Sequence, residues 1–396
     1  MNRSFLLLVL LCSLCLLSAC GGGGGSSSIP PPPPPVFNFT VLHSFTGGVN
    51  GGSSFAGVIL DSAGNLYGTT EMGGAFQGGT VFKLDPTGVE TVLYSFTGGA
   101  DGADPQTGLV RDSAGNLYGT AGPSFGEVFR LDPTGREITL YTFKGGADGG
   151  FLHGAMVRDP AGNLYGTAIS GGDTSCAAFG CGVVFKVDAN GTETVLHRFT
   201  GPDGVEPFGD LIRDSAGNLY GITMNGGASG FGVVFKLDTT GEETTLHSFT
   251  GRTDGGGPEA GLVADAAGNL YGTASGGGAS GFGVVFKLDL TGNETVLYSF
   301  TGGTDGAAPF GVLALDAEGN LYGTTNSGGD LSSCFGFGCG VVFKVDASGK
   351  ETVLHSFTGG ADGANPVAGL VQDAAGHLYG VAFGGGASGF GVVFKL

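Results

Sequence analysis

Four cysteines, in two pairs of identical spacing, are the residues whose types and positions point most clearly to chemistry. The pairs are Cys176 with Cys181 and Cys334 with Cys339. Four cysteines allow three pairings. An exported chain would oxidise them to disulfides, whereas thiolates in a reducing compartment could form a metal clip. Because no histidine accompanies either pair at ligand spacing, we expect disulfides and no metal site.

The histidines supply no catalytic constellation. Four of the six occupy a position that is tyrosine in other copies of an internal repeat, which indicates a structural role: His43, His197, His247 and His355. His153 departs from the repeat and is the candidate pocket histidine. A general base needs an oriented partner, and the sequence places none beside it. No glycine-rich phosphate loop with its lysine is present either. We therefore predict no catalytic residues.

The composition excludes several classes of protein. Glycine contributes 84 of 396 residues without a three-residue period, which excludes a collagen helix. A hydrophobic content of 41% with 30 phenylalanines argues against disorder. A net charge of −19 with only 16 Lys and Arg gives no electrostatic basis for binding nucleic acid. The composition therefore favours a fold of many short strands joined by tight turns.

The first segment has the features of an export signal. Arg3 precedes a largely apolar run over residues 5–17, which is too short to span a bilayer. The run ends in Leu-Ser-Ala-Cys, which resembles the lipobox of bacterial lipoproteins. The resemblance implies removal of residues 1–19 and lipidation of Cys20, and Gly21 after the cysteine implies the outer membrane. The alternative is an ordinary cleavable signal.

A tether follows the signal. Residues 20–36 contain five consecutive glycines, three serines and six consecutive prolines. Glycine and serine make a flexible chain, and the prolines add a stiff spacer. We expect this segment to hold a folded domain of residues 37–396 away from a surface.

That domain consists of seven copies of one repeat unit. The string Leu-Tyr-Gly recurs every 47 to 57 residues. In the unit that starts at Gly108, four β-rich runs, A to D, cover residues 108–112, 116–120, 128–131 and 138–143, with glycine-containing turns between them. Four short antiparallel strands per repeat are typical of a β-propeller blade.

The ends of the repeat array predict a closed ring. The last run C is residues 393–396, whereas the first run D, residues 40–45, precedes any run A. Pairing these two completes a seventh four-stranded blade and leaves no free sheet edge. We predict an all-β, seven-bladed propeller that is closed by its N-terminal strand and monomeric. The two cysteine pairs then lie nearly opposite each other in the ring, so only the local pairings are geometrically reasonable.

The unit resembles two known repeats. Its Asp-x-x-Gly-Asn turn and Val-Phe-x-x-Asp strings are similar to an NHL-type blade, whose pattern includes a Val-Phe-x-x-Asp-Gly string. The fuller string at residues 81–105 resembles the GloVer tandem repeat of bacterial choice-of-anchor proteins, and this resemblance covers residues 40–396. It implies an architecture and an anchor, but no activity.

The B–C and D–A loops should share one face of the ring, and the B–C loops vary most in length. Each B–C loop contains a phenylalanine that could bind a partner or cap the gap between blades: Phe76, Phe125, Phe179, Phe231, Phe282, Phe337 and Phe390. The D–A loops carry aspartates that could ring the channel and attract a cation, or could stabilise turns: Asp101, Asp148, Asp203, Asp254, Asp305 and Asp362.

We therefore expect a lipid-anchored propeller in the bacterial cell envelope. It would act without a cofactor as a non-catalytic binding or scaffolding module, with the loop face presented to an unidentified glycan, peptide or envelope protein. The membrane would be a second partner, contacted through the lipid on Cys20. We expect no binding to nucleic acid. The alternative is a lyase or lactone hydrolase with Ca²⁺ or Mg²⁺ in the central channel.

Overall fold

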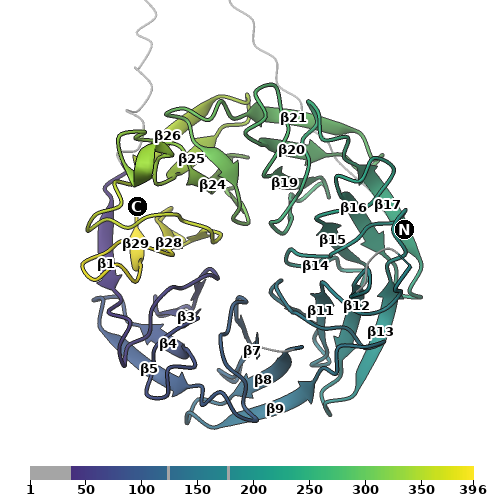
Figure 1. The fold of residues 1–396 in the computed structure, drawn as a ribbon, viewed down its shortest axis with the longest axis horizontal. Helices are drawn as coiled ribbons and strands as arrows, with labels where there is room; N and C mark the ends of the chain where they lie inside the picture. The colour runs from purple at the N-terminus through teal and green to yellow at the C-terminus, as the bar shows by residue number, and fades with distance from the viewer. Residues whose placement is uncertain (1–36, 123–124, 176–178) are drawn as a thin grey trace, which may run out of the picture. The chain divides into compact units, whose positions relative to one another are not determined.

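A computed structural model describes residues 37–122, 125–175 and 179–396. Seven antiparallel sheets are arranged around a central channel, as in a β-propeller (Figure 1). The predicted fold class is thus confirmed. The predicted signal, Cys20 and the tether lie outside the described residues and stay predictions.

Each blade has a short innermost strand and a long outermost strand. Blades 1 to 3 contain β2 (Ile59–Leu60), β3 (Leu66–Thr70), β4 (Thr80–Leu84) and β5 (Glu90–Ser95); β6 (Val110–Arg111), β7 (Leu117–Ala121), β8 (Glu127–Leu131) and β9 (Glu137–Thr142); and β10 (Val157–Arg158), β11 (Leu164–Ala168), β12 (Val183–Val187) and β13 (Glu193–Arg198).

Blades 4 and 5 follow the same order. They contain β14 (Ile212–Arg213), β15 (Leu219–Thr223), β16 (Val233–Leu237) and β17 (Glu243–Ser248), then β18 (Val263–Ala264), β19 (Leu270–Ala274), β20 (Val284–Leu288) and β21 (Glu294–Ser299).

Blade 6 has one additional short strand. It contains β22 (Ala307–Pro309), β23 (Ala314–Leu315), β24 (Leu321–Ser327), β25 (Val341–Val345) and β26 (Glu351–Ser356), and its B–C loop carries the 3₁₀ turn η1 (Cys334–Gly336). Blade 7 contains β27 (Val371–Gln372), β28 (Leu378–Ala382), β29 (Val392–Lys395) and β1 (Thr40–Ser44).

The N-terminal strand closes the ring. Strand β1 pairs antiparallel with β29, with Thr40 opposite Lys395 and Ser44 opposite Val392. The predicted closure is confirmed, because the first strand of the domain completes the sheet that contains the last one.

Pairs of phenylalanines hold neighbouring blades together. The residue after each outermost strand packs edge-to-face on the phenylalanine of strand C in the next blade, with ring centroids 4.8–5.4 Å apart. The glycine of each Leu-Tyr-Gly string makes room for the strand C ring: a Cβ on Gly68 would lie 2.7 Å from the Phe82 ring. The pairs are Phe45–Phe82, Phe96–Phe129, Phe143–Phe185, Phe199–Phe235, Phe249–Phe286, Phe300–Phe343 and Phe357–Phe394.

The A–B turn is held by its aspartate. In the first blade the Asp61 carboxylate accepts hydrogen bonds from the backbone N–H groups of Ala63 and Asn65, the Asn65 amide and the Tyr67 hydroxyl. Burial alone would raise the pKa of Asp61, but these donors outweigh it and lower that pKa to about 2. The repeated string Asp-x-x-Gly-Asn-Leu-Tyr is therefore a structural motif.

Candidate ligand site at the mouth of the channel

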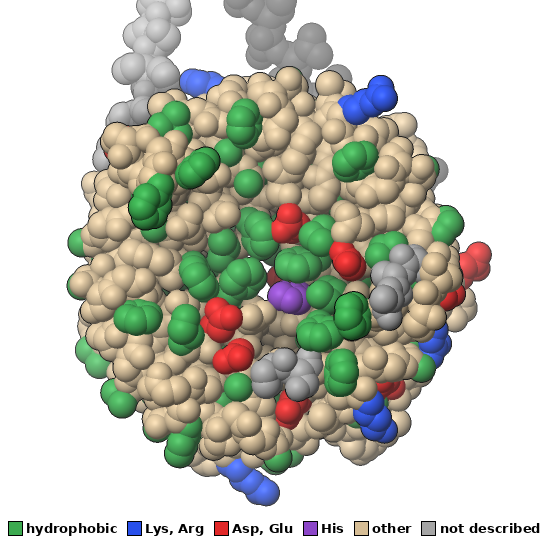
Figure 2. Space-filling model, viewed as in Figure 1, with side chains coloured by type: hydrophobic (Ala, Val, Ile, Leu, Met, Phe, Trp, Pro, Cys, Tyr) green, Lys and Arg blue, Asp and Glu red, His purple; other side chains and the backbone are tan. Residues whose placement is uncertain are grey.

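A cavity of about 260 Å³ lies at the channel, where the segments that precede the innermost strands of all seven blades converge. The space-filling view shows the central hollow, with a histidine and acidic side chains around it (Figure 2). A volume of this size is just below the range of about 300–1,000 Å³ that is common for small-molecule pockets. It suits a small ligand or the tip of a larger one.

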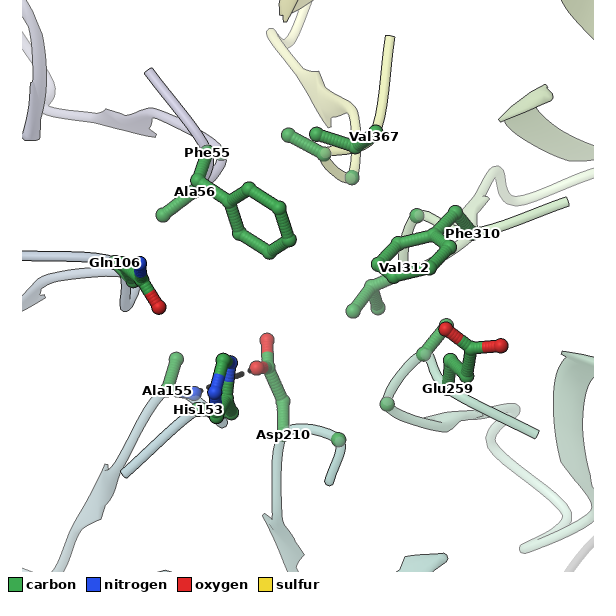
Figure 3. A pocket seen from close by; sticks show the side chains of 18 of the residues that line it. Phe55, Ala56, Gln106, His153, Ala155, Asp210, Glu259, Phe310, Val312 and Val367 are labelled. Carbon is green, nitrogen blue, oxygen red and sulfur yellow. Dashed lines mark hydrogen bonds between the residues drawn. The ribbon is translucent and has the colours of Figure 1, made fainter. Parts of the chain in front are cut away.

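One residue per blade forms what we call the inner ring. Each member lies three positions before the buried residue that immediately precedes the innermost strand of its blade. The seven residues therefore occupy equivalent positions around the axis (Figure 3). The inner ring consists of Phe55, Gln106, His153, Phe208, Glu259, Phe310 and Val367.

Close backbone packing fixes these segments. A Cβ on Gly154 would lie 2.3 Å from the carbonyl oxygen of Gly209, and a Cβ on Gly209 would lie 2.5 Å from that of Ala260. Only glycine allows this approach. In blades 3, 4 and 6 the glycine directly follows the inner-ring residue, and the residue after this glycine also faces the cavity. These residues are Ala155, Asp210 and Val312.

Among the described residues, Asp210 is one of the two acids that line the cavity, the other being Glu259. Its side chain points into the channel (Figure 3), and its Oδ1 accepts a hydrogen bond of 2.6 Å from the backbone N–H of Ala155. The carboxylate borders the lumen but is surrounded by protein, and this burial raises its pKa. The charged form of Asp210 thus lacks a counter-charge.

His153 and Glu259 are the titratable groups of the inner ring. The His153 ring stacks on Phe208 with centroids 4.6 Å apart, and its Nδ1 is shielded from solvent without a hydrogen-bond partner. Burial lowers the pKa of His153, so the imidazole is neutral at pH 7. Glu259 accepts a 2.7 Å hydrogen bond from the Ser275 hydroxyl, and burial raises its pKa.

Three aromatic rings complete the wall. Phe310 lies edge-to-face with Phe55 and with Phe208, at centroid distances of 6.0 and 6.2 Å. Phe55 also contacts Phe383, which follows β28. Rings from blades 1, 4, 6 and 7 therefore meet across the channel, and an apolar surface faces the polar groups.

The blades differ from one another most clearly around this cavity. The strand C phenylalanine is present in all seven copies, but the inner ring contains five residue types. The residue four positions after the tyrosine of each Leu-Tyr-Gly string differs in every blade: Glu71, Gly122, Ile169, Met224, Ser275, Asn326 and Phe383. Two of these support inner-ring residues, since Ser275 bonds Glu259 and Glu71 accepts a 2.7 Å hydrogen bond from Gln106.

The structure places His153 in this cavity but places the six D–A aspartates elsewhere. Asp101 accepts hydrogen bonds from the Tyr94 hydroxyl and from the backbone N–H and hydroxyl of Thr97. Its counterparts bond the matching tyrosine, histidine or loop backbone in their own blades. All six are described residues. They do not line the channel cavity, and each accepts hydrogen bonds within its own loop beside an outermost strand, as the turn role predicts.

The loop phenylalanines divide into two groups. Phe125 covers Gly145 in the loop that leads to the next blade, where a Cβ would lie 2.1 Å from the ring. The same contact is made by Phe231 on Gly251, Phe282 on Gly302 and Phe390 on Gly47. These four cap the connection between blades and are at most 46% exposed, whereas Phe76, Phe179 and Phe337 are 62–77% exposed. None of the seven, all of which are described, lines the cavity.

A disulfide replaces the capping ring in blade 6. Cys334 and Cys339 are bonded, as predicted, and their sulfurs lie about 3 Å from the position of a Cβ on Gly359. In blade 3, Cys181 is buried. Its predicted partner Cys176 lies outside the described residues, so the Cys176–Cys181 disulfide stays a prediction.

The cavity does not provide the donor set of a metal enzyme. Within the residues that the structure describes, no group of three or more His, Cys, Asp or Glu side chains is placed to hold a metal ion. His153, Asp210 and Glu259 thus do not fit the Ca²⁺ or Mg²⁺ site of the alternative hypothesis, and we derive no reaction through one. No helix in the described part of the chain is long and apolar enough to cross a membrane.

Comparisons with known proteins agree with this architecture. A family model described as the Gloeobacter/Verrucomicrobia repeat matches residues 33–179, 123–337 and 251–396. No match was found among curated proteins.

Among solved structures, the extracellular domain of a putative hybrid two-component system from B. thetaiotaomicron matches with a TM-score of 0.60 and 12% identity, over 90% of this chain and 41% of that one. The extracellular domain of a putative one-component system from the same organism matches with a TM-score of 0.56 and 14% identity, over 91% and 41%. This chain spans about two fifths of their length, and at these identities the likeness concerns the fold alone.

A Xanthomonas campestris gluconolactonase matches with a TM-score of 0.45 and 13% identity, over 90% of this chain and 88% of that one. This level of similarity carries no argument about activity.

Proposed function

The chain belongs to the Gloeobacter/Verrucomicrobia repeat family, and we propose that its propeller is a non-catalytic binding module that holds a small soluble ligand at the mouth of the channel. The observation that carries this proposal is the divergence of the inner ring. Blades that share one packing pattern differ in charge and size at the inner-ring position, which faces the cavity. A ligand on the axis contacts each blade once, so its recognition needs different residues at that register.

Binding is favoured over catalysis by the arrangement of the polar groups. Nδ1 of His153 lacks a hydrogen-bond partner, and Asp210 is oriented by a backbone N–H. The cavity therefore lacks the oriented acid–base pair that proton transfer needs. The glycine contacts between blades hold the ring segments rigidly, which lowers the entropic cost of binding.

A bulky residue at Val367 tests this proposal. Val367→Trp would fill the cavity, whereas Leu290→Trp changes an exposed residue in the turn between β20 and β21, on the opposite face. Ligand-observed NMR would screen mixtures of saccharides, amino acids, amines, carboxylates and short peptides. We expect one class to bind the native protein and Leu290→Trp, with a loss of at least tenfold in affinity for Val367→Trp. Binding of no class, or unchanged binding to Val367→Trp, would refute the proposed site.

We also propose that the module is anchored in the cell envelope by lipid on Cys20. The lipobox-like string and the Gly/Ser/Pro tether support this location. Cys20→Ser is expected to move the protein from the membrane fraction to the soluble periplasmic fraction, measured by immunoblotting of both fractions. Unchanged fractionation would contradict lipid anchoring without affecting the ligand site.

A further inference from the structure

We infer that the channel mouth recognises an organic ammonium cation, either a protonated amine or a quaternary ammonium group. This inference rests on the proposed function and adds the chemical class of the ligand. It depends on three features of the cavity: the sign of its charge, its aromatic wall and the unpaired state of its polar atoms.

The cavity is acidic without a compensating base. Asp210 and Glu259 line it, and no Lys or Arg is found among its described lining residues. The neutral His153 adds no positive charge. Two carboxylates repel an anionic ligand, and the chain's net charge of −19 attracts cations toward the opening. An anionic ligand such as a phosphate or an organic acid is therefore disfavoured when these carboxylates are ionised.

The aromatic rings suit an organic cation better than a metal ion. Phe55 and Phe310 point into the lumen across from the Asp210 carboxylate (Figure 3). An ammonium group is attracted to the face of a phenylalanine, by about 0.5–2 kcal/mol per ring depending on desolvation. A bare metal ion requires several oxygen or nitrogen ligands instead, and the described residues contain no group of three or more His, Cys, Asp or Glu side chains that could hold one.

The polar atoms of the cavity lack the partner that such a ligand would supply. A buried carboxylate without a counter-charge is unfavourable, and the hydrogen bond from Ala155 to Asp210 is neutral. Nδ1 of His153 is buried without a partner and close to the same space. An ammonium group in the cavity would pair with the Asp210 carboxylate.

Two pairs of isosteric probes separate charge from shape. Choline and 3,3-dimethyl-1-butanol have nearly the same shape, as do benzylamine and benzyl alcohol, but only the first member of each pair is a cation. Isothermal titration calorimetry on the full chain at pH 8 is expected to show at least tenfold tighter binding of one cation than of its neutral isostere.

Asp210→Asn provides the matched variant, because the amide oxygen can still accept the hydrogen bond from Ala155 while the charge is lost. It should reduce cation affinity at least tenfold and leave the affinity for the neutral isostere unchanged. Glu259→Gln, a second variant of the same kind, should also weaken the cation, and Glu242→Gln, at an exposed site, should not.

The outcomes distinguish this inference from the proposed function. Equal affinity within both pairs, no binding of either cation, or unchanged cation binding to Asp210→Asn and Glu259→Gln would overturn the cation assignment. If a neutral saccharide or peptide then bound and was lost in Val367→Trp, the binding module would stand with a different ligand. If no compound bound, both would fail.

Discussion

Phe45→Ala is expected to lower the free energy of unfolding by about 3–5 kcal/mol, the usual cost of deleting a buried aromatic ring. Phe45 follows β1, is fully buried and packs on Phe82 at 5.2 Å between ring centroids. It belongs to the strand that closes the ring, so its loss weakens both the last sheet and the contact between blades 7 and 1. Equilibrium denaturation followed by circular dichroism measures the effect.

Two variants make this prediction specific to closure. Phe199→Ala removes the equivalent ring where the chain is continuous, since Phe199 packs on Phe235 at the same distance. It should cost about as much as Phe45→Ala if the closing junction is as tight as the others. Phe231→Ala removes a half-exposed capping ring and should cost about 1 kcal/mol or less. If Phe45→Ala behaved like Phe231→Ala, the closure would contribute little to stability.

The fold was predictable because its signals repeat. Seven copies of one hairpin turn, one central strand and one Val-Phe string identify the blade, and the early run D at residues 40–45 identifies the closure. Asp61 and Gly68 show why these strings recur. The Asp61 carboxylate accepts the hydrogen bonds that hold its turn, and Gly68 leaves room for the Phe82 ring. Every blade must satisfy the same contacts, so the same residues recur.

The candidate site was much less predictable, because a ligand on the axis breaks the sevenfold repetition. His153 stands out from the repeat because four of the other five histidines occupy the tyrosine position, whereas Asp210 and Glu259 depart from the pattern among many other acidic residues. The repeated loop aspartates and phenylalanines were more conspicuous as candidates. In the structure, repetition accompanies packing: Asp101 holds its own loop and Phe125 covers Gly145. Comparison of the seven blades at one register would have indicated the inner ring.

The propeller is expected to be most stable near pH 4.5–5 and to lose stability toward pH 8. In six of the seven blades the first residue of the outermost strand is a glutamate, and it lies beside the preceding blade. Burial, with a smaller contribution from Asp254, raises the pKa of Glu294 to about 7, and burial with Asp305 does the same for Glu351. Oε1 of both side chains is buried without a hydrogen-bond partner. Ionising them in the folded state is therefore unfavourable.

The direction of this pH dependence follows from proton linkage. Below about pH 4.5, the glutamate pKa in the unfolded chain, these glutamates are protonated in both states and the free energy of unfolding is not reduced by their ionisation. It falls as the pH rises through about 7, because the glutamates ionise more easily in the unfolded chain. Turn aspartates act oppositely at low pH. Asp61 and Asp373, with pKa values of about 2, lose stabilisation once the pH falls below about 4. The two effects together place the maximum between them.

Neutral isosteres test the glutamates directly. The double variant Glu294→Gln/Glu351→Gln imitates the protonated state, so it should be more stable than the native protein at pH 8 and equal to it at pH 4.5. We expect roughly 1 kcal/mol per site after allowing for solvent screening, or about 2–4 °C in Tm for both together. Glu242→Gln/Glu318→Gln, at two exposed positions, should leave Tm unchanged at either pH. Calorimetry at the two pH values distinguishes the cases: a gain at pH 4.5 as large as that at pH 8 would mean that the substitutions act through packing, because ionisation cannot contribute where both states are protonated.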